Sequence, residues 1–485
     1  MPSAEPRSSE QVGIILVHGV GEQRRFEHLA SQLRDLIRAL NGLKAKGQVE
    51  QVSVDISGSG AAAFQAEHDT WNAGPEASVT VVVNHRLKGE LSETRLMVHE
   101  VWWADVNEPY SIAKQFRFWL WGLAVWAHPG KQRSSLATAD RVAPPVLPED
   151  SARLRGSGWD RIRLFLVGFV FVLVAYSIGT IAVVLNRLIN WQSPNLLKVM
   201  TNYVSAVKLY NQPHRLGPGL PGASDDFLDS IDEPPRVSVR RRMIRAIADV
   251  ACNDYARWYV LAHSQGSVVA FNGLMETAYA WPGYLNQDRW NRLMCHDPPL
   301  GGPAVGMPIP DQTKPMMPRR PAWLPQDYIA YRSHIFRRFQ GFLTYGSPLE
   351  KFAGLWPALV PISRELSSND NIPWINVYDP IDPISGRLLA FTKQPAECCP
   401  QPQDLGYAAG WILLLAHLKY LTGRNDGNDL ATATVRWLNR RREKNAFCWI
   451  VCQSSGALPP FRGDLRVGGG GFPYKIAYGC RVPSI

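Results

Sequence analysis

Residues 258–271 of this chain read WYVLAHSQGSVVAF, and this stretch decides the fold. The apolar run at 258–261 predicts a buried strand, and residues 267–271 predict the start of a helix. Ser264 stands between the two in a turn that contains glycine. A strand, a serine in a sharp turn and a helix form the layout of a nucleophile elbow, which lifts the serine hydroxyl above the sheet edge. Ser264 is therefore a candidate nucleophile for acyl transfer.

The turn departs from the usual pattern, Gly-x-Ser-x-Gly, at its first position, where this chain has Ala262. A small residue is needed there because the turn brings the strand close to the helix, and alanine meets that need. A different interpretation fits the same five residues. The serine and glycine would then only start a helix, with the Ser264 hydroxyl as its buried cap.

A second stretch near the N-terminus favours the catalytic interpretation. Residues 12–17 read VGIILV, as expected of a buried parallel strand, and run into the glycine-rich turn at 18–23. Such a turn presents a backbone N–H group to the oxyanion that develops during acyl transfer. Gly19 or Val20 would supply the first donor, a choice that the sequence leaves open, and Gln265 would supply the second.

The order of residues along the chain suggests the partners of Ser264. In a fold with this elbow the nucleophile is followed by the acid and then by the histidine. An apolar strand at 374–378 ends in a turn that carries Asp379 and Asp382, and His417 is the one histidine downstream of both. The alternative for His417 is a structural histidine on an apolar helix, satisfied in the core.

With these motifs the chain resembles the α/β-hydrolase superfamily, in particular serine hydrolases of the lipase and esterase kind. It is similar to bacterial proteins of the glycosyl-phosphatidylinositol inositol-deacylase and class 3 lipase groups. The resemblance covers about residues 11–35, 250–275 and 335–440, and the matching stretches include Leu343–Pro348, the turn with both aspartates, and His417 with Tyr420. It implies an α/β fold with a mostly parallel central sheet flanked by helices.

The resemblance also implies roles for the site residues. In such proteins the acid stands directly before Pro or Val at the end of a strand, which favours Asp382 and keeps Asp379 as the alternative. His417 would take the proton of Ser264, and Asp382 would orient its imidazole. No cofactor is expected, and no metal, because Cys448 and Cys452 lack a second pair of ligands.

The long apolar run Leu164–Leu185 is the second main feature of the chain. It carries no charge, and as a helix it would span about 33 Å, close to the thickness of a bilayer core. The first predicted strand precedes it and Ser264 follows it, so a single crossing would separate the two halves of the sheet. A shorter apolar segment, Phe116–Ala127, offers a second pass. Three arrangements therefore remain for Leu164–Leu185. It spans the membrane as half of a hairpin, it enters and leaves the membrane on one face, or it forms an apolar cap of a soluble enzyme.

The chain is expected to divide into four parts. Residues 11–108 would form the N-terminal part of the hydrolase core, with strands at 51–56, 78–84 and 93–106. Residues 109–200 would form a hydrophobic helical insertion at the membrane. Residues 201–445 would complete the core, with a possible cap at 296–325, and residues 446–485 would form a peripheral tail.

The charge of the chain, +10 at neutral pH with a pI near 9.3, favours an anionic membrane surface as a partner. The cluster Arg240–Arg242 contributes to this charge. It is either part of a membrane-binding surface or only the solvated face of a helix. No nucleic acid is expected, since the chain has no zinc-finger, RNP-like or helix-turn-helix pattern. The first residues show no signal peptide, so we expect the cytoplasmic side of a membrane, the inner membrane if the protein is bacterial.

Together these features predict a membrane-associated serine hydrolase that cleaves carboxylic esters, in particular lipid or other acyl-chain esters. One alternative is an esterase or thioesterase for soluble substrates, with the apolar run as a cap or anchor. The other is a membrane-bound scaffold whose hydrolase domain has lost its activity.

Overall fold

The computed structural model of the chain describes residues 8–19, 27–45, 51–55, 76–87, 90–103, 177, 235–304, 320–355, 359–360, 373–380, 382, 384–392, 401–407, 417, 420, 430–431 and 434. The predicted insertion at 109–200, apart from Ser177, and the predicted tail at 446–485 lie outside these residues. In the described part of the chain, no helix has the length and apolar character needed to cross a membrane.

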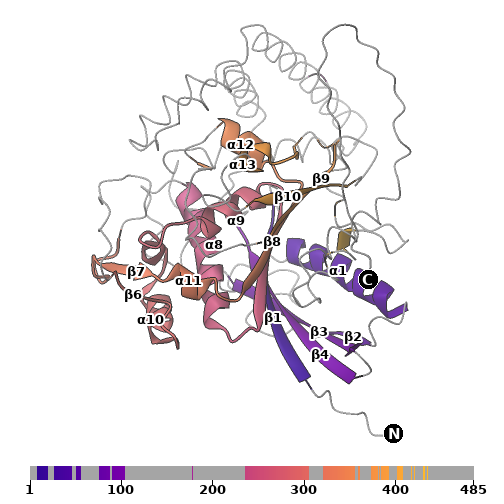
Figure 1. The fold of residues 1–485 in the computed structure, drawn as a ribbon, viewed down its shortest axis with the longest axis horizontal. Coiled ribbons are helices and arrows are strands. Elements are labelled where there is room, and N and C mark those ends of the chain that lie inside the picture. Colours follow the sequence, from indigo (N-terminus) through magenta and orange to yellow (C-terminus); the bar gives the residue numbers. More distant parts are fainter. Residues whose placement is uncertain are drawn as a thin grey trace, which may run out of the picture.

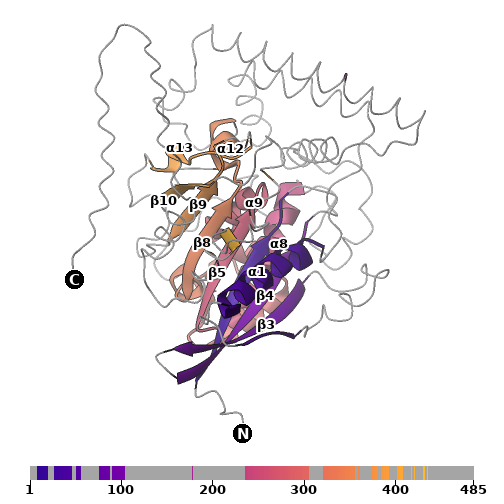
Figure 2. The same ribbon diagram turned by 90° about the vertical axis from the view of Figure 1, so that its right-hand side faces the viewer.

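Within the described residues, eight strands form one sheet in the order β10-β9-β8-β5-β1-β4-β3-β2. Their bounds are β1 Ser8–Val17, β2 Gln51–Asp55, β3 Glu76–Leu87, β4 Glu90–Val101, β5 Arg257–His263, β8 Phe339–Tyr345, β9 Trp374–Tyr378 and β10 Pro402–Gly406. Figure 2 shows the strands passing from β10 at one edge of the sheet towards β3, which lies next to the strand β2 at the other edge. The N-terminal strands and the later ones therefore build a single sheet.

The helices of the described residues are α1 Glu27–Ala45, α8 Pro235–Cys252, α9 Gly266–Leu274, α10 Gln287–Cys295, α11 Arg332–Ile335, α12 Leu349–Leu355 and α13 Leu389–Thr392, with one 3-10 turn, η2, at Trp281–Tyr284. The predicted α/β class with a mostly parallel central sheet is confirmed. Strand β3 is the exception, because it pairs antiparallel with both β4 and β2.

The three strands predicted in the N-terminal part have different bounds in the structure. The strand expected at 51–56 is β2, which ends at Asp55, and the strand expected at 78–84 is β3, which extends from Glu76 to Leu87. The strand expected at 93–106 is β4, which begins at Glu90 and ends at Val101. It begins early because the antiparallel pairing with β3 continues to the pair Leu87 and Glu90. It ends early because the backbone N–H of Trp103 donates to the ring of His18.

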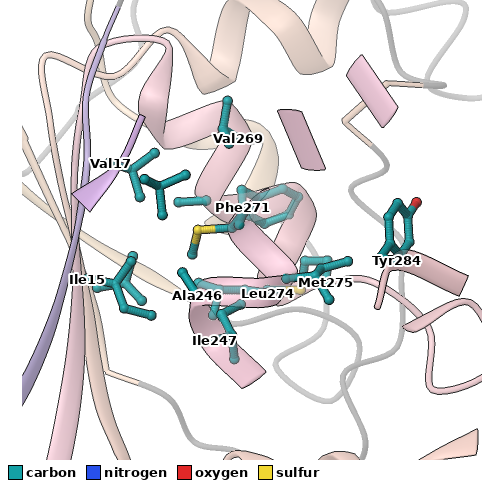
Figure 3. Packing of buried hydrophobic residues seen from close by; sticks show 14 of the residues in the cluster. Ile15, Val17, Ala246, Ile247, Val269, Phe271, Leu274, Met275 and Tyr284 are labelled. Carbon is teal, nitrogen blue, oxygen red and sulfur yellow. The ribbon is translucent and has the colours of Figure 1, made fainter. Parts of the chain in front are cut away.

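The alternating side chains of β1 divide the core into two layers. Ile15 and Val17 pack with α8 and α9, whereas Ile14 and Leu16 pack with α1 on the opposite face. Figure 1 shows α8 and α9 on one side of the strands and α1 on the other. Figure 3 shows Ile15 and Val17 facing the side chains of the two helices, including Phe271. Because strand side chains alternate, a central strand between two helical layers is apolar where both faces are covered, and β1 has no polar side chain from Val12 to Val17.

The arginine cluster of α8 does not form a solvent-facing charged patch. Arg240 and Arg241 are buried, and Arg240 forms an ion pair with Glu276 at 2.6 Å inside the protein. Arg242 donates to the carbonyl oxygen of Trp102 at 2.9 Å. Both interpretations of this cluster from sequence, a membrane-binding patch and a solvated helix face, are therefore wrong for Arg240 and Arg241. These charges connect α8 to neighbouring segments.

Two described residues of the predicted cap at 296–325, His296 and Leu300, lie near the start of β5. Strands β6 Gly301–Pro303 and β7 Tyr328–Ala330 form a separate two-stranded sheet. His296 and Leu300 line a small cavity together with Trp258, which is near the first residue of β5. Ser264 follows the other end of that strand, so residues 296 and 300 do not cover it. Residues 305–319 lie outside the described part.

The parallel strands end side by side at one edge of the sheet. Val17 of β1 pairs with Ala262 of β5, Ala262 pairs with Thr344 of β8, and Thr344 pairs with Asn376 of β9. Ligand and catalytic sites of open α/β sheets form outside the carboxyl ends of the strands. The residues that follow these four strands are therefore the place to look for a site.

Candidate active site

Ser264 follows β5 directly and adopts a backbone conformation that non-glycine residues rarely adopt. Its φ angle is 52°, in the left-handed region, and the residue is buried. The turn is held by the N–H of Ser264, which donates to the carbonyl oxygen of Tyr345 at 3.0 Å, and by the hydroxyl of Ser267, which donates to the carbonyl oxygen of Ser264 at 2.6 Å. A left-handed serine costs about 1–2 kcal/mol, and such strain persists where neighbours fix the chain.

Two glycines make the close packing at this turn possible. A Cβ atom on Gly266 would lie 2.4 Å from the carbonyl oxygen of His18, and one on Gly19 would lie 2.6 Å from the Cβ of Ser264. The end of β1 and the start of α9 thus meet at the serine without intervening side chains. Ala262, the departure from the usual motif, is fully buried and pairs in register with Val17.

The hydroxyl of Ser264 lies in a chain of hydrogen bonds formed by three residues that are distant in the sequence. Its Oγ is 2.8 Å from Nε2 of His417, and Nδ1 of His417 is 2.8 Å from Oδ2 of Asp382. All three side chains are buried. The structure thus brings Ser264, His417 and Asp382 together at the carboxyl edge of the sheet, and the carboxylate that contacts His417 is that of Asp382.

The other aspartate of the turn, Asp379, forms backbone hydrogen bonds to Asp382 and to Tyr420. Its carbonyl oxygen accepts from the N–H of Asp382 at 3.0 Å, and its own N–H donates to the hydroxyl of Tyr420 at 2.8 Å. The backbone of Asp379 therefore shapes the turn in which Asp382 reaches His417.

Three donors hold the Asp382 carboxylate in its ionised form. Oδ1 accepts from the N–H of Ile384 at 2.8 Å, and Oδ2 accepts from His417 and from the hydroxyl of Tyr420, the latter at 2.9 Å. Burial alone would raise the pKa of Asp382, but the hydrogen bond and charge of His417, with the other two donors, lower the pKa to about 2. The carboxylate therefore stays charged at neutral pH and favours the Nδ1–H form of His417.

A second histidine, His263, lies against His417 and forms a hydrogen bond to its backbone. Its Nε2 lies 3.0 Å from the carbonyl oxygen of His417, and the two ring centroids are 5.1 Å apart. Burial, with a smaller contribution from His417, lowers the pKa of His263 to about 3. The ring is therefore neutral and donates its Nε2–H to that carbonyl oxygen. His263 has no role predicted from the sequence, although it is the residue directly before the serine.

Burial of His263 predicts an acid-labile fold. Unfolded, His263 takes up a proton near its ordinary pKa of 6.5, whereas the folded ring stays neutral down to about pH 3. The unfolded state binds the additional proton between these values, so stability is complete above pH 6.5 and decreases as the pH falls towards 3. Wild type should lose about 2 kcal/mol more unfolding free energy than His263→Gln between about pH 6.5 and pH 5.

Urea unfolding at the two pH values measures this difference. His99, whose pKa burial lowers to about 4, is present in both proteins and does not affect the comparison. Equal losses in wild type and His263→Gln would contradict the assignment of a neutral His263.

The first two residues of the predicted oxyanion turn, His18 and Gly19, are held by contacts with Trp103 and with each other. The backbone N–H of Trp103 donates to Nε2 of His18 at 2.9 Å, and its indole N–H donates to the His18 carbonyl oxygen at 3.0 Å. Because Nε2 accepts, the proton of the neutral ring is on Nδ1, which lies 2.6 Å from the carbonyl oxygen of Gly19. These contacts fix the backbone at Gly19 beside Ser264.

Of the predicted oxyanion donors, the structure describes Gly19 and Gln265. Gln265 is the N-cap residue of α9 and is fully buried, so its backbone lies at the positive end of the helix dipole. Val20 lies outside the described residues.

Comparison of the chain with protein-family models, with curated proteins and with solved structures gives no match. The interpretation of the site therefore depends on its geometry.

Proposed function

We propose that the protein is a serine hydrolase that cleaves carboxylic esters through an acyl-enzyme on Ser264. The supporting observation is the buried chain from the Ser264 hydroxyl through His417 to Asp382, with 2.8 Å at each step. A structural cap of α9 would need neither a histidine on the hydroxyl nor a carboxylate behind that histidine. Mutual hydrogen bonding of nucleophile, base and orienting acid is the geometric signature of nucleophilic catalysis.

The reaction follows from the chemistry of the three groups. His417 Nε2 takes the proton of Ser264 as its oxygen attacks the ester carbonyl, and the carboxylate of Asp382 stabilises the imidazolium that forms. The imidazolium then protonates the leaving alcohol. Water, deprotonated by the same imidazole, attacks the acyl-enzyme, and the acid product leaves with Ser264 restored. Each backbone N–H donor at the oxyanion is worth about 3 kcal/mol of barrier.

We also propose that the sheet is that of an α/β-hydrolase. In support, Ser264 stands in a left-handed turn between the parallel strand β5 and helix α9. The acid follows the strand β9, and the histidine comes last in the chain, which is the order of nucleophile, acid and base in that fold.

For the substrate, we propose lipid or other acyl-chain esters met at the cytoplasmic side of an anionic membrane. The support is in the sequence, namely the uncharged run Leu164–Leu185 and the net charge of +10. An enzyme held at a bilayer reaches esters that do not dissolve in water.

Hydrolysis of p-nitrophenyl esters of increasing acyl length tests the substrate. The full chain, in detergent or in vesicles with anionic lipid, should show a larger kcat/KM for long acyl chains than for acetate, about tenfold or more. Fractionation of expressing cells should release the protein with detergent and not with high salt. A preference for acetate together with release by salt would favour the soluble-ester alternative.

A further inference from the structure

The hydroxyl of Tyr420 joins three parts of the turn that carries Asp382. It donates to Oδ2 of Asp382 at 2.9 Å, accepts from the N–H of Asp379 at 2.8 Å, and lies 2.8 Å from the hydroxyl of Ser385. A phenol donates one hydrogen bond and accepts two. The carboxylate takes the one proton of Tyr420, so Ser385 donates to Tyr420, and the bonding capacity of the phenol is fully used.

The ring of Tyr420 is fixed by packing as well as by these bonds. It lies perpendicular to the ring of His417 at a centroid distance of 6.4 Å, and it stacks on Tyr407 at the same distance. Gly346 has a φ angle of 64°, and a Cβ there would lie 3.0 Å from Tyr420 and 3.1 Å from the imidazole of His417. A side chain at position 346 would therefore crowd both rings, and the glycine leaves them the space that they occupy.

Tyr420 and His417 bind the same oxygen of the carboxylate. Oδ2 of Asp382 accepts from both, and Oδ1 accepts from the N–H of Ile384. Any rotation of the carboxylate that breaks the bond to His417 also breaks the bond to Tyr420 or to Ile384. The hydroxyl of Tyr420 thus resists the motion that would detach the acid from the base.

We propose that Tyr420 is a positioning residue that holds Asp382 in the orientation in which it serves His417, a role that rests on the proposed serine hydrolase function. Tyr420 acts through Asp382 and does not touch the Ser264 hydroxyl. Its hydrogen bond also draws electron density from Oδ2, which weakens the carboxylate as a partner of the imidazolium. Removal of the bond therefore has two effects, a less firmly positioned acid and a stronger attraction between its carboxylate and the imidazolium that forms during the reaction.

The variant Tyr420→Phe tests both effects because it keeps the packed ring and removes the hydroxyl. With a p-nitrophenyl ester as substrate, kcat should fall roughly tenfold to hundredfold, with KM within about twofold of wild type. The acid limb of the pH–rate profile should move to higher pH by a few tenths of a unit, about what one hydrogen bond contributes. The other titratable groups around the acid, namely Lys351 of α12, His263 of β5 and Asp379, are the same in both proteins.

Ser385→Ala is the matched control. It removes a buried hydroxyl from the same cluster and leaves the bond from Tyr420 to Asp382 in place, so kcat and the acid limb should stay close to wild type. Acid unfolding of a destabilised variant would also move this limb to higher pH, so the limb is compared only over the pH range in which circular dichroism shows each variant to be folded. Equal losses of kcat in both variants, with unmoved limbs, would mean that the cluster is merely structural.

Different results would overturn the positioning role of Tyr420 and the proposed serine hydrolase function. A wild-type protein that neither hydrolyses the ester nor reacts with a fluorophosphonate probe would overturn both proposals. An active wild type with a Tyr420→Phe variant of equal kcat and equal acid limb would overturn the positioning role alone.

Discussion

Ser264→Ala is expected to reduce kcat for ester hydrolysis by about a millionfold, the loss measured when a triad serine is removed from a comparable enzyme. In the proposed mechanism the oxygen of this hydroxyl forms the acyl-enzyme, and the imidazole of His417 lies within hydrogen-bond reach of it to take its proton. Without it, only the oxyanion donors and substrate binding remain, which give a far smaller acceleration over water.

A companion variant, Ser264→Gly, separates this loss from unfolding. Ser264 has a φ angle of 52°, which glycine adopts without strain. Ser264→Gly should therefore be as inactive as Ser264→Ala but more stable than it, by about 1 kcal/mol of unfolding free energy. Stopped or continuous ester assays with denaturant unfolding measure both quantities. Activity of either variant within about a hundredfold of wild type would mean that another nucleophile does the work.

Asp382→Asn is expected to lower kcat by about 10⁴-fold while leaving KM and the fold nearly unchanged. The N–H of Ile384 donates to Oδ1 of Asp382, so in the variant the amide oxygen takes that place. The amide NH₂ then faces Nδ1 of His417 and donates to it. The proton of the imidazole moves to Nε2, where it blocks the acceptance of the Ser264 proton.

Asp379→Asn is the matched control, since Asp379 is the neighbouring buried aspartate of the same turn. Its backbone makes two contacts in the turn, through its carbonyl oxygen to Asp382 and through its N–H to Tyr420. The loss of kcat should stay below about tenfold, because both backbone bonds survive the change. A larger loss in Asp379→Asn than in Asp382→Asn would reverse the assignment of the acid.

The local pattern around Ser264 was predictable because it depends on neighbours in the sequence. The apolar run, the small residues and the helix start at 258–271 together predict a strand, a turn and a helix, and β5 and α9 have that arrangement. The parallel neighbour β1 was likewise predictable, since a strand buried on both faces is apolar throughout. The confirmed α/β class follows from these elements.

Chain order and the resemblance indicated Ser264, His417 and Asp382 as partners, but the supporting contacts of His263 and Tyr420 were not predicted, because they depend on contacts between distant segments. Asp379 and Asp382 have nearly the same local sequence context, and only the path of their turn decides which one reaches His417. The bond from His263 to the His417 carbonyl oxygen joins residues 154 positions apart. One signal was present for Tyr420, which stands three residues after His417 and so on the same face if that segment is helical.

The placement of the arginines in α8 shows a further limit. A run of three arginines is typical of a protein surface that faces solvent or an anionic partner, yet Arg240 and Arg241 are buried. Their burial depends on partners such as Glu276, which lies 36 residues away from Arg240. Sequence charge alone therefore does not assign the basic residues of this chain to a membrane surface.

The most direct test of the catalytic site is the position of a covalent adduct. The purified full-length chain is treated with a fluorophosphonate probe, digested, and analysed by mass spectrometry. A single adduct on Ser264, formed by wild type and not by His417→Ala, is the result expected if the imidazole activates that hydroxyl. An unlabelled wild type, or an adduct on another residue, would contradict it.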